Sequence, residues 1–137
     1  MAEKNAILND FSEKCKFIKS DAFDFLKKSE EASYDSIVVD PPAFVKSKSA
    51  LKEAVRAYRD INSRAMRLLK PGGLMAVCSC SYHIQKSLFN EIIRSAAKDA
   101  NKNFKIIESR TQAKDHPVLL SMPETEYLKC LIIESIG

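Results

Sequence analysis

The stretch SIVVDPPAFVKSKSA, residues Ser36–Ala50, decides the fold, because an apolar, β-branched run ends there in an acid, two prolines and an aromatic residue. The run Tyr34–Val39 predicts a short strand that is covered on both faces of a sheet. The two prolines fix the backbone φ angle and carry no N–H group, so they form a stiff ledge. That ledge holds Asp40 and Phe44 in a fixed relation just beyond the strand.

Asp40 and Phe44 each allow two interpretations. An acid before proline often only begins a turn, and an aromatic residue after a strand can simply belong to the core. The stiff double proline favours a functional interpretation of the pair. In that interpretation Asp40 is presented at the strand end, and Phe44 stacks on a flat ligand such as a nucleobase.

Strands and helices alternate along the rest of the chain. Leu51–Leu69 carries apolar residues at helical spacing, and the following KPGG has the composition that ends a helix. Further helices are expected at Ala2–Phe11, Asp21–Lys28 and Ile84–Ala100, and further strands at Lys14–Lys19, Leu74–Cys78, Phe104–Glu108 and Tyr127–Glu134. This alternation predicts an α/β fold with a largely parallel sheet and helices on both faces.

Two polar segments follow neighbouring strands of the predicted sheet. DPPAF follows Val39, and CSCSYH occupies residues 78–83 at the end of the next strand. A long helical crossover joins the two strands, which makes them parallel neighbours. In open α/β sheets ligands bind beyond the carboxyl ends of the strands. The two segments are therefore expected to lie side by side at one site.

Cys78 and Cys80 are the candidates for a reactive thiol at that site. Cys78 lies inside the apolar run, where a thiol usually acts as a small buried hydrophobe. Cys80 lies one step past the run, between Ser79 and Ser81. An exposed thiol near the amino end of a helix, with His83 close by, has its thiolate favoured. Cys80 is thus the preferred nucleophile, and His83 is interpreted as a loop residue.

Composition restricts the class of protein. The chain has 137 residues, 45% hydrophobic and 29% charged, which suits one globular domain. No apolar run approaches the roughly 18 residues that cross a bilayer, and the first residues lack a signal-peptide core. A cytoplasmic location without a membrane partner is therefore expected. Four cysteines without CxxC spacing indicate no metal site, and three glycines leave no GxGxxG or GxxxxGK loop.

A basic patch follows the proline ledge. It consists of Lys46, Lys48, Lys52, Arg56 and Arg59. A solvated helix face is the usual explanation of such a patch. Its position beside a predicted base pocket makes contact with nucleic-acid phosphates the second interpretation. The net charge of +4 is compatible with a polyanionic partner.

Three blocks, YDSIVVDPPAFVKSK, LLKPGGLMAVCSCSYH and DHPVLLSMPETEYLKC, together resemble the catalytic domain of the large-subunit ribosomal RNA cytosine-5 methyltransferases. Those enzymes use S-adenosylmethionine and typically carry an N-terminal PUA RNA-binding domain. The resemblance covers nearly all 137 residues, and the three blocks in this order are highly specific. It implies a Rossmann-like class I methyltransferase fold, a three-layer sandwich whose mostly parallel sheet has an antiparallel terminal strand.

The resemblance also implies roles for individual residues. Asp21 and Ala22 would meet the adenine of S-adenosylmethionine, although Asp21 alone also fits a helix N-cap. Asp40 and Pro41 would complete the cofactor side of the site, with Asp40 beside the target cytosine. The residues expected to contact the substrate, ribosomal RNA, are Pro42, Phe44, Lys46 and Lys48.

Cys80 matches the family's Ser-Cys-Ser nucleophile. Cys78 remains the alternative, because related RNA methyltransferases place their cysteine in a Thr-Cys-Ser-like stretch. A thiolate that adds to C6 of cytosine makes C5 nucleophilic, and Asp40 would supply or share the proton at N3. His116, in the third block, has no assigned role.

The family's domain begins earlier than this sequence does. Its first strand, its glycine-rich loop and its second strand with a ribose-binding acid all precede AEKNAILND in the family. Residues 1–137 are therefore interpreted as the C-terminal part of one catalytic domain, with the missing N-terminal segment as its partner. Alone, the chain is expected to bind S-adenosylmethionine weakly or not at all, to be inactive, and to self-associate through exposed sheet edges.

Two rival functions are consistent with the same residues. DPP-aromatic motifs also serve the methylation of exocyclic amino groups in nucleic acids, which needs no cysteine. Alternatively the chain is a non-catalytic module for RNA binding or assembly, for which salt-dependent RNA binding without cofactor would be the sign.

Overall fold

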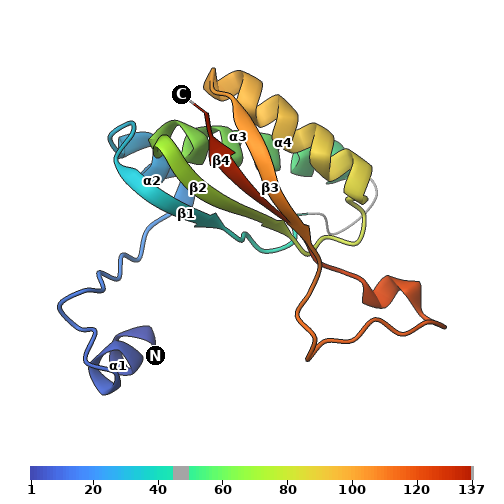
Figure 1. Ribbon diagram of the computed structural model, residues 1–137, viewed down its shortest axis with the longest axis horizontal. Helices are drawn as coiled ribbons and strands as arrows, with labels where there is room; N and C mark the ends of the chain where they lie inside the picture. The colour runs from blue at the N-terminus through green and yellow to red at the C-terminus, as the bar shows by residue number, and fades with distance from the viewer. Residues whose placement is uncertain (45–49, 137) are drawn as a thin grey trace.

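The computed structural model describes residues 1–44 and 50–136, which form a mixed α/β fold. In chain order the elements are α1 (Ala2–Leu8), α2 (Ala22–Lys28), β1 (Tyr34–Val39), α3 (Leu51–Leu68), β2 (Leu69–Ser79), α4 (Lys86–Ala100), β3 (Phe104–Arg110), the 3-10 helix η2 (Pro123–Thr125) and β4 (Lys129–Ser135). The four strands make one sheet in the order β1-β2-β4-β3 (Figure 1). The predicted α/β class is confirmed, and so is the antiparallel terminal strand.

The strand directions agree with the sheet that the sequence predicts, because β1, β2 and β3 run in one direction and β4 alone runs against them. β1 and β2 are parallel, as expected from the α3 crossover between them. β4 lies between β2 and β3 and is antiparallel to both. Only one described pair is therefore parallel, because β4 follows β3 in the chain yet inserts beside β2.

The crossover helix α3 forms where its apolar stripe predicts it. Ala54, Tyr58, Ile61 and Ala65 recur at helical spacing and are all buried against the sheet and α4. The helix ends at Leu68 because Leu69 is already extended and pairs with Tyr34 of β1. The KPGG segment consequently lies inside β2, where the pairing register with β1 shifts, and β2 begins earlier than predicted.

Gly73 sits at the closest approach of β2 to β1. A Cβ atom at Gly73 would lie 2.8 Å from Leu69 Cγ, 2.9 Å from the Lys70 carbonyl oxygen and 3.0 Å from the Asp35 carbonyl oxygen. Since two of these neighbours are backbone atoms, we expect Gly73→Ala to lower the free energy of unfolding by about 1–3 kcal/mol. Urea unfolding at constant protein concentration measures this change in the free energy of unfolding.

Gly72 provides the matched control for that change. It has φ of +76°, but a Cβ atom at this position would have nothing within 4 Å, so Gly72→Ala adds backbone strain without a clash. That strain costs about 1–2 kcal/mol. A Gly73→Ala protein as stable as the parent would show that the strands can separate at this point, and would contradict the packing described.

The helices α2, α3 and α4 all lie on one face of the sheet (Figure 1). Met75 and Val77 of β2 face them and are completely buried, whereas Leu74 on the opposite face is 43% exposed. On β1, Val38 is 73% exposed on that opposite face. Within the described residues, the expected second helical layer is therefore not observed. The prediction that β1 is covered on both faces is wrong for this chain, because no described element packs on its outer side.

Residues 14–19 do not form the predicted strand. They are exposed, and they belong to an extended connection that leads to α1, which stands apart from the sheet (Figure 1). Alternating apolar residues stabilise a strand only when a neighbour accepts its hydrogen bonds, and no described strand pairs with the outer edge of β1. Because the outer edge of β1 and one face of the sheet are exposed, self-association stays a prediction. Among the described residues no helix is long and apolar enough to cross a membrane.

Candidate active site

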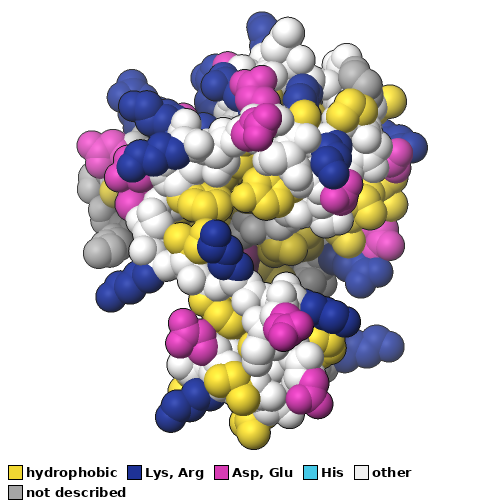
Figure 2. All heavy atoms as spheres, turned by 90° about the vertical axis from the view of Figure 1, so that its left-hand side faces the viewer, with side chains coloured by type: hydrophobic (Ala, Val, Ile, Leu, Met, Phe, Trp, Pro, Cys, Tyr) yellow, Lys and Arg dark blue, Asp and Glu magenta, His cyan; other side chains and the backbone are white. Residues whose placement is uncertain are grey.

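A groove of about 950 Å³ follows the outer edge of β1 and collects most of the predicted site residues. Its lining includes Asp21, Ala22, Asp40, Pro41, Pro42 and Phe44. Figure 2, which faces this edge, shows hydrophobic side chains gathered around a hollow. The fold thus brings the residues predicted for the cofactor and those predicted for the base into one cavity. Lys46 and Lys48 lie outside the described residues, and Cys80 does not line the groove.

Asp21 has a structural task at one end of the groove. Its Oδ1 accepts hydrogen bonds from the backbone N–H of Phe23 at 2.9 Å and of Asp24 at 3.1 Å, so it is the N-cap of α2. The N-cap alternative is therefore confirmed. The cap also fixes the Asp21 carboxylate at the groove, and its contact with a cofactor stays a prediction.

Phe44 is partly buried and packs on the core. Its ring meets that of Tyr58 edge to face, with centroids 4.7 Å apart and planes at 65°. The core interpretation of Phe44 is thus supported, since Tyr58 is completely buried within α3. Phe44 also lines the groove, so stacking of a base on its remaining surface stays a prediction.

The strand ends that carry Asp40 and the cysteines are neighbours, as predicted. β1 and β2 run parallel, with Val39 paired to Val77, so Asp40 and Cys78 follow side by side. Burial raises the pKa of the Tyr58 phenol, and the nearby charges of Cys80 and Asp40 raise it further. Tyr58 also contacts the neighbours of both groups, since Ser79 donates to its hydroxyl at 3.2 Å and the Phe44 ring packs on its ring.

Cys78 is held as a neutral thiol. It lies opposite Cys130 in the antiparallel pairing of β2 with β4. Burial raises the pKa of Cys78 to about 12, and a hydrogen bond with the Cys130 side chain, together with the charges of Cys130, Asp40 and Cys80, adds to the rise. A thiol with that pKa carries almost no thiolate near neutral pH. The structure therefore disfavours Cys78 as a nucleophile.

The loop around Cys80 is fixed on both sides. Ser79 and Ser81 are buried, and the Ser81 N–H donates to Ser79 Oγ at 3.3 Å. Lys129 Nζ, from the start of β4, donates to the carbonyl oxygens of Ser81 at 2.7 Å and Tyr127 at 2.9 Å. These bonds set the backbone course before and after Cys80, which lies past the end of β2.

Lys129 is a cation near Cys80 that the motifs of the sequence do not single out. Burial lowers the pKa of Lys129, while the charges of Cys80 and Glu126 act in the opposite direction. The only signal for Lys129 in the sequence is its membership of the third block, because the pairing of Ser79 with Lys129 depends on where β4 inserts.

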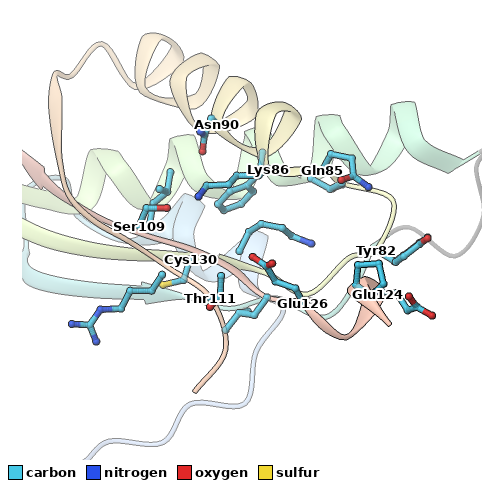
Figure 3. Close-up of a pocket in the computed structure, with 16 residues that line it drawn as sticks. Tyr82, Gln85, Lys86, Asn90, Ser109, Thr111, Glu124, Glu126 and Cys130 are labelled. Carbon is cyan, nitrogen blue, oxygen red and sulfur yellow. The ribbon is translucent and has the colours of Figure 1, made fainter. Parts of the chain in front are cut away.

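A second cavity of about 350 Å³ lies beyond this loop, between the amino end of α4, the strands β3 and β4, and η2 (Figure 3). Tyr82, Lys86, Glu124 and Glu126 are among its lining residues. Neither Asp40 nor Cys80 lines it, and its charges are of both signs. It is therefore separate from the predicted base-handling residues.

The described part of the basic patch is not uniformly positive. Arg59 forms a two-pronged ion pair with Asp99 of α4. Arg56 and Arg59 share a shallow cleft with Asp60 and Asp99. Charges of both signs on this face favour the solvated-helix interpretation for Arg59, and phosphate contact by the patch stays a prediction. His116 is exposed, with its ring packed edge to face on Tyr127.

Comparisons with known proteins agree with this arrangement. Residues 1–123 match a family model described as a methyltransferase domain. Over 134 residues the chain is 42% identical to ribosomal RNA large subunit methyltransferase I of Pseudoalteromonas atlantica, which covers 96% of this chain and 34% of that protein. The protein of the same name from Cronobacter sakazakii is 43% identical over 132 residues, 94% of this chain and 33% of its own length.

The solved structure of SMU.776 complexed with SAH shares the fold, with a TM-score of 0.67 and 22% identity over 84% of this chain and 30% of that one. The chain spans about a third of the length of the curated relatives it matches. The match of the family model to most of the described residues, together with the convergence of the two strand ends, shows that the chain belongs to the methyltransferase-domain family.

Proposed function

We propose that these residues form the catalytic portion of an S-adenosylmethionine-dependent ribosomal RNA methyltransferase, which methylates C5 of a cytosine in large-subunit RNA through Cys80. The names of the relatives support the substrate class. The observation that carries the cysteine mechanism is the contrast between two thiols: Cys78 is held neutral, while Cys80 lies past the strand end between two fixed serines.

The groove along β1 fits part of the cofactor. Ala22, Phe23 and Val39 give it apolar walls of the kind that hold a flat purine, and Asp21 offers carboxylate oxygens that can accept from an exocyclic amino group. When bound, S-adenosylmethionine supplies an electrophilic methyl group. Asp21 and Ala22 would hold its adenine, and Asp40 and Pro41 would lie toward the base.

The chain's own residues would then perform the covalent steps. The Cys80 thiolate adds to C6 of the cytosine, and the electron pair of the C5–C6 double bond becomes available at C5. Charge that moves toward N3 and O2 is met by a proton carried by or shared with the Asp40 carboxyl group. After C5 has gained the methyl group, loss of the C5 proton restores the double bond and expels the thiolate.

Product identity tests the proposal. The intact natural protein that contains these residues is incubated with unmethylated ribosomal RNA and labelled S-adenosylmethionine, and the digested nucleosides are analysed by mass spectrometry. We expect 5-methylcytidine. An N-methylated nucleoside would establish the amino-group alternative, and salt-dependent RNA binding without methyl transfer would establish the non-catalytic one.

The isolated 137-residue chain is assayed in parallel. We expect weak or undetectable cofactor binding in titration calorimetry, and no methyl transfer. Tight stoichiometric binding by these residues alone would contradict the expectation that further protein is needed to complete the cofactor site.

A further inference from the structure

We infer that Tyr58 is a positioning residue whose ring contacts the Asp40 segment and whose hydroxyl bonds to the Cys80 segment, so that it sets their relative placement. This inference rests on the proposed function, because it concerns the two groups that would act on one pyrimidine. It assigns a task to a residue of the crossover helix that belongs to neither motif. The task is to hold the two strand ends together.

The first link runs from Tyr58 to the loop that carries Cys80. The Ser79 hydroxyl donates to the Tyr58 hydroxyl oxygen at 3.2 Å, and the Ser81 N–H donates to Ser79 Oγ at 3.3 Å. All three residues are buried. Because Cys80 lies between the two serines, its backbone is held from both sides by a chain of hydrogen bonds that ends on Tyr58.

The second link runs from Tyr58 to the segment that carries Asp40. The Phe44 ring packs edge to face on the Tyr58 ring, with centroids 4.7 Å apart. The Pro41–Pro42 ledge connects Phe44 rigidly to Asp40. A single side chain thus contacts both motifs.

The position of Tyr58 is itself fixed by the helix. Asn62, one turn later on α3, donates from Nδ2 to the Tyr58 carbonyl oxygen at 2.7 Å and is also buried. A phenylalanine would fill the same space without the cost of burying a hydroxyl group. The hydroxyl is therefore explained by its bond to Ser79 on the Cys80 segment rather than by packing.

Tyr58→Phe tests the link, because it keeps the ring and removes only the hydroxyl. In the intact natural protein we expect kcat for methyl transfer to fall by about 10- to 100-fold, the order expected when reacting groups are misplaced by around 1 Å. KM for RNA should change little, since no RNA contact is removed. Tyr127→Phe, at a partly exposed tyrosine that does not line the groove, is the matched control and should leave kcat unchanged.

Two further measurements separate positioning from a general loss of stability. In a double-mutant cycle, Ser79→Ala combined with Tyr58→Phe should be no slower than the more impaired single variant, because both break the same link. Hydrogen exchange of the 137-residue chain should become faster at residues 79–82 in Tyr58→Phe, with exchange in α4 unchanged.

Unchanged kcat, additive losses in the cycle, or unchanged exchange at residues 79–82 would each overturn the inference. Failure of the proposed function is distinguishable from these results. A product other than 5-methylcytidine rejects the cytosine mechanism but leaves the Tyr58 measurements valid. If no methyl group is transferred at all, the inference is judged by exchange and by the rate at which iodoacetamide alkylates Cys80. That rate should change in Tyr58→Phe and not in Tyr127→Phe.

Discussion

Cys80→Ala is expected to abolish methyl transfer, with a loss of at least about 10³-fold, because removal of a covalent nucleophile leaves C5 of cytosine unactivated. Cys78→Ala should retain most of the activity. Cys78 is a half-buried thiol opposite Cys130, and burial raises its pKa to about 12, which keeps it protonated under assay conditions. The two variants remove the same sulfur-bearing side chain at positions two residues apart, so each is the control for the other.

The adduct provides the direct measurement for this pair. RNA that contains 5-fluorocytosine cannot lose a C5 proton after methylation, so the protein should remain attached to it. In the intact protein, denaturing gels should show this adduct for the parent and for Cys78→Ala, and none for Cys80→Ala. The reverse pattern would make Cys78 the nucleophile, and full activity of the double alanine variant would reject covalent catalysis altogether.

Asp40→Asn should lower kcat by about 10²- to 10⁴-fold, the range for loss of a general acid or base. The amide keeps the shape of the side chain but cannot carry the proton that N3 requires. Asp35→Asn is the matched control on the same strand. Asp35 is an exposed carboxylate paired with Lys70 at 2.9 Å, and it does not line the groove.

Adduct formation distinguishes the possible roles of Asp40. If Asp40 assists attack at C6, then Asp40→Asn slows both adduct formation with 5-fluorocytosine RNA and methyl transfer with normal RNA. Equal rates for Asp40→Asn and Asp35→Asn would place the proton source elsewhere and remove Asp40 from the mechanism. Thermal melting of both variants controls for loss of structure.

Local patterns predicted most of the elements of the fold. The apolar stripe of α3 is buried, as its helical periodicity indicates. The β-branched run of β1 forms a strand, as its composition indicates. The interpretation of residues 14–19 as a strand is wrong, because strand formation depends on a pairing neighbour that periodicity cannot reveal. The order of the strands in the sheet could not be predicted for the same reason, because it depends on pairing between segments that are distant in the sequence. Nothing within β4 specifies that it pairs with β2 as well as β3.

Of the candidate site, the sequence allowed only the motif residues to be predicted. Asp40 and Cys80 follow strand ends, and the parallel pairing of β1 with β2 brings those ends together. The opposition of Cys78 and Cys130, the bond from Lys129 to Ser81 and the role of Tyr58 all depend on tertiary register. These residues are distant in the sequence and carry no motif of their own.

The insertion of β4 between β2 and β3 has a consequence for biosynthesis. During translation β2 emerges well before β3, yet the two cannot join one sheet until Lys129–Ser135 has left the ribosome and entered between them. Until then β2 can pair only with β1, and the apolar helix-facing side chains of β3 and α4 lack their final partner. The nascent chain therefore passes through an incomplete, aggregation-prone stage, and its duration is set by the synthesis of the last strand.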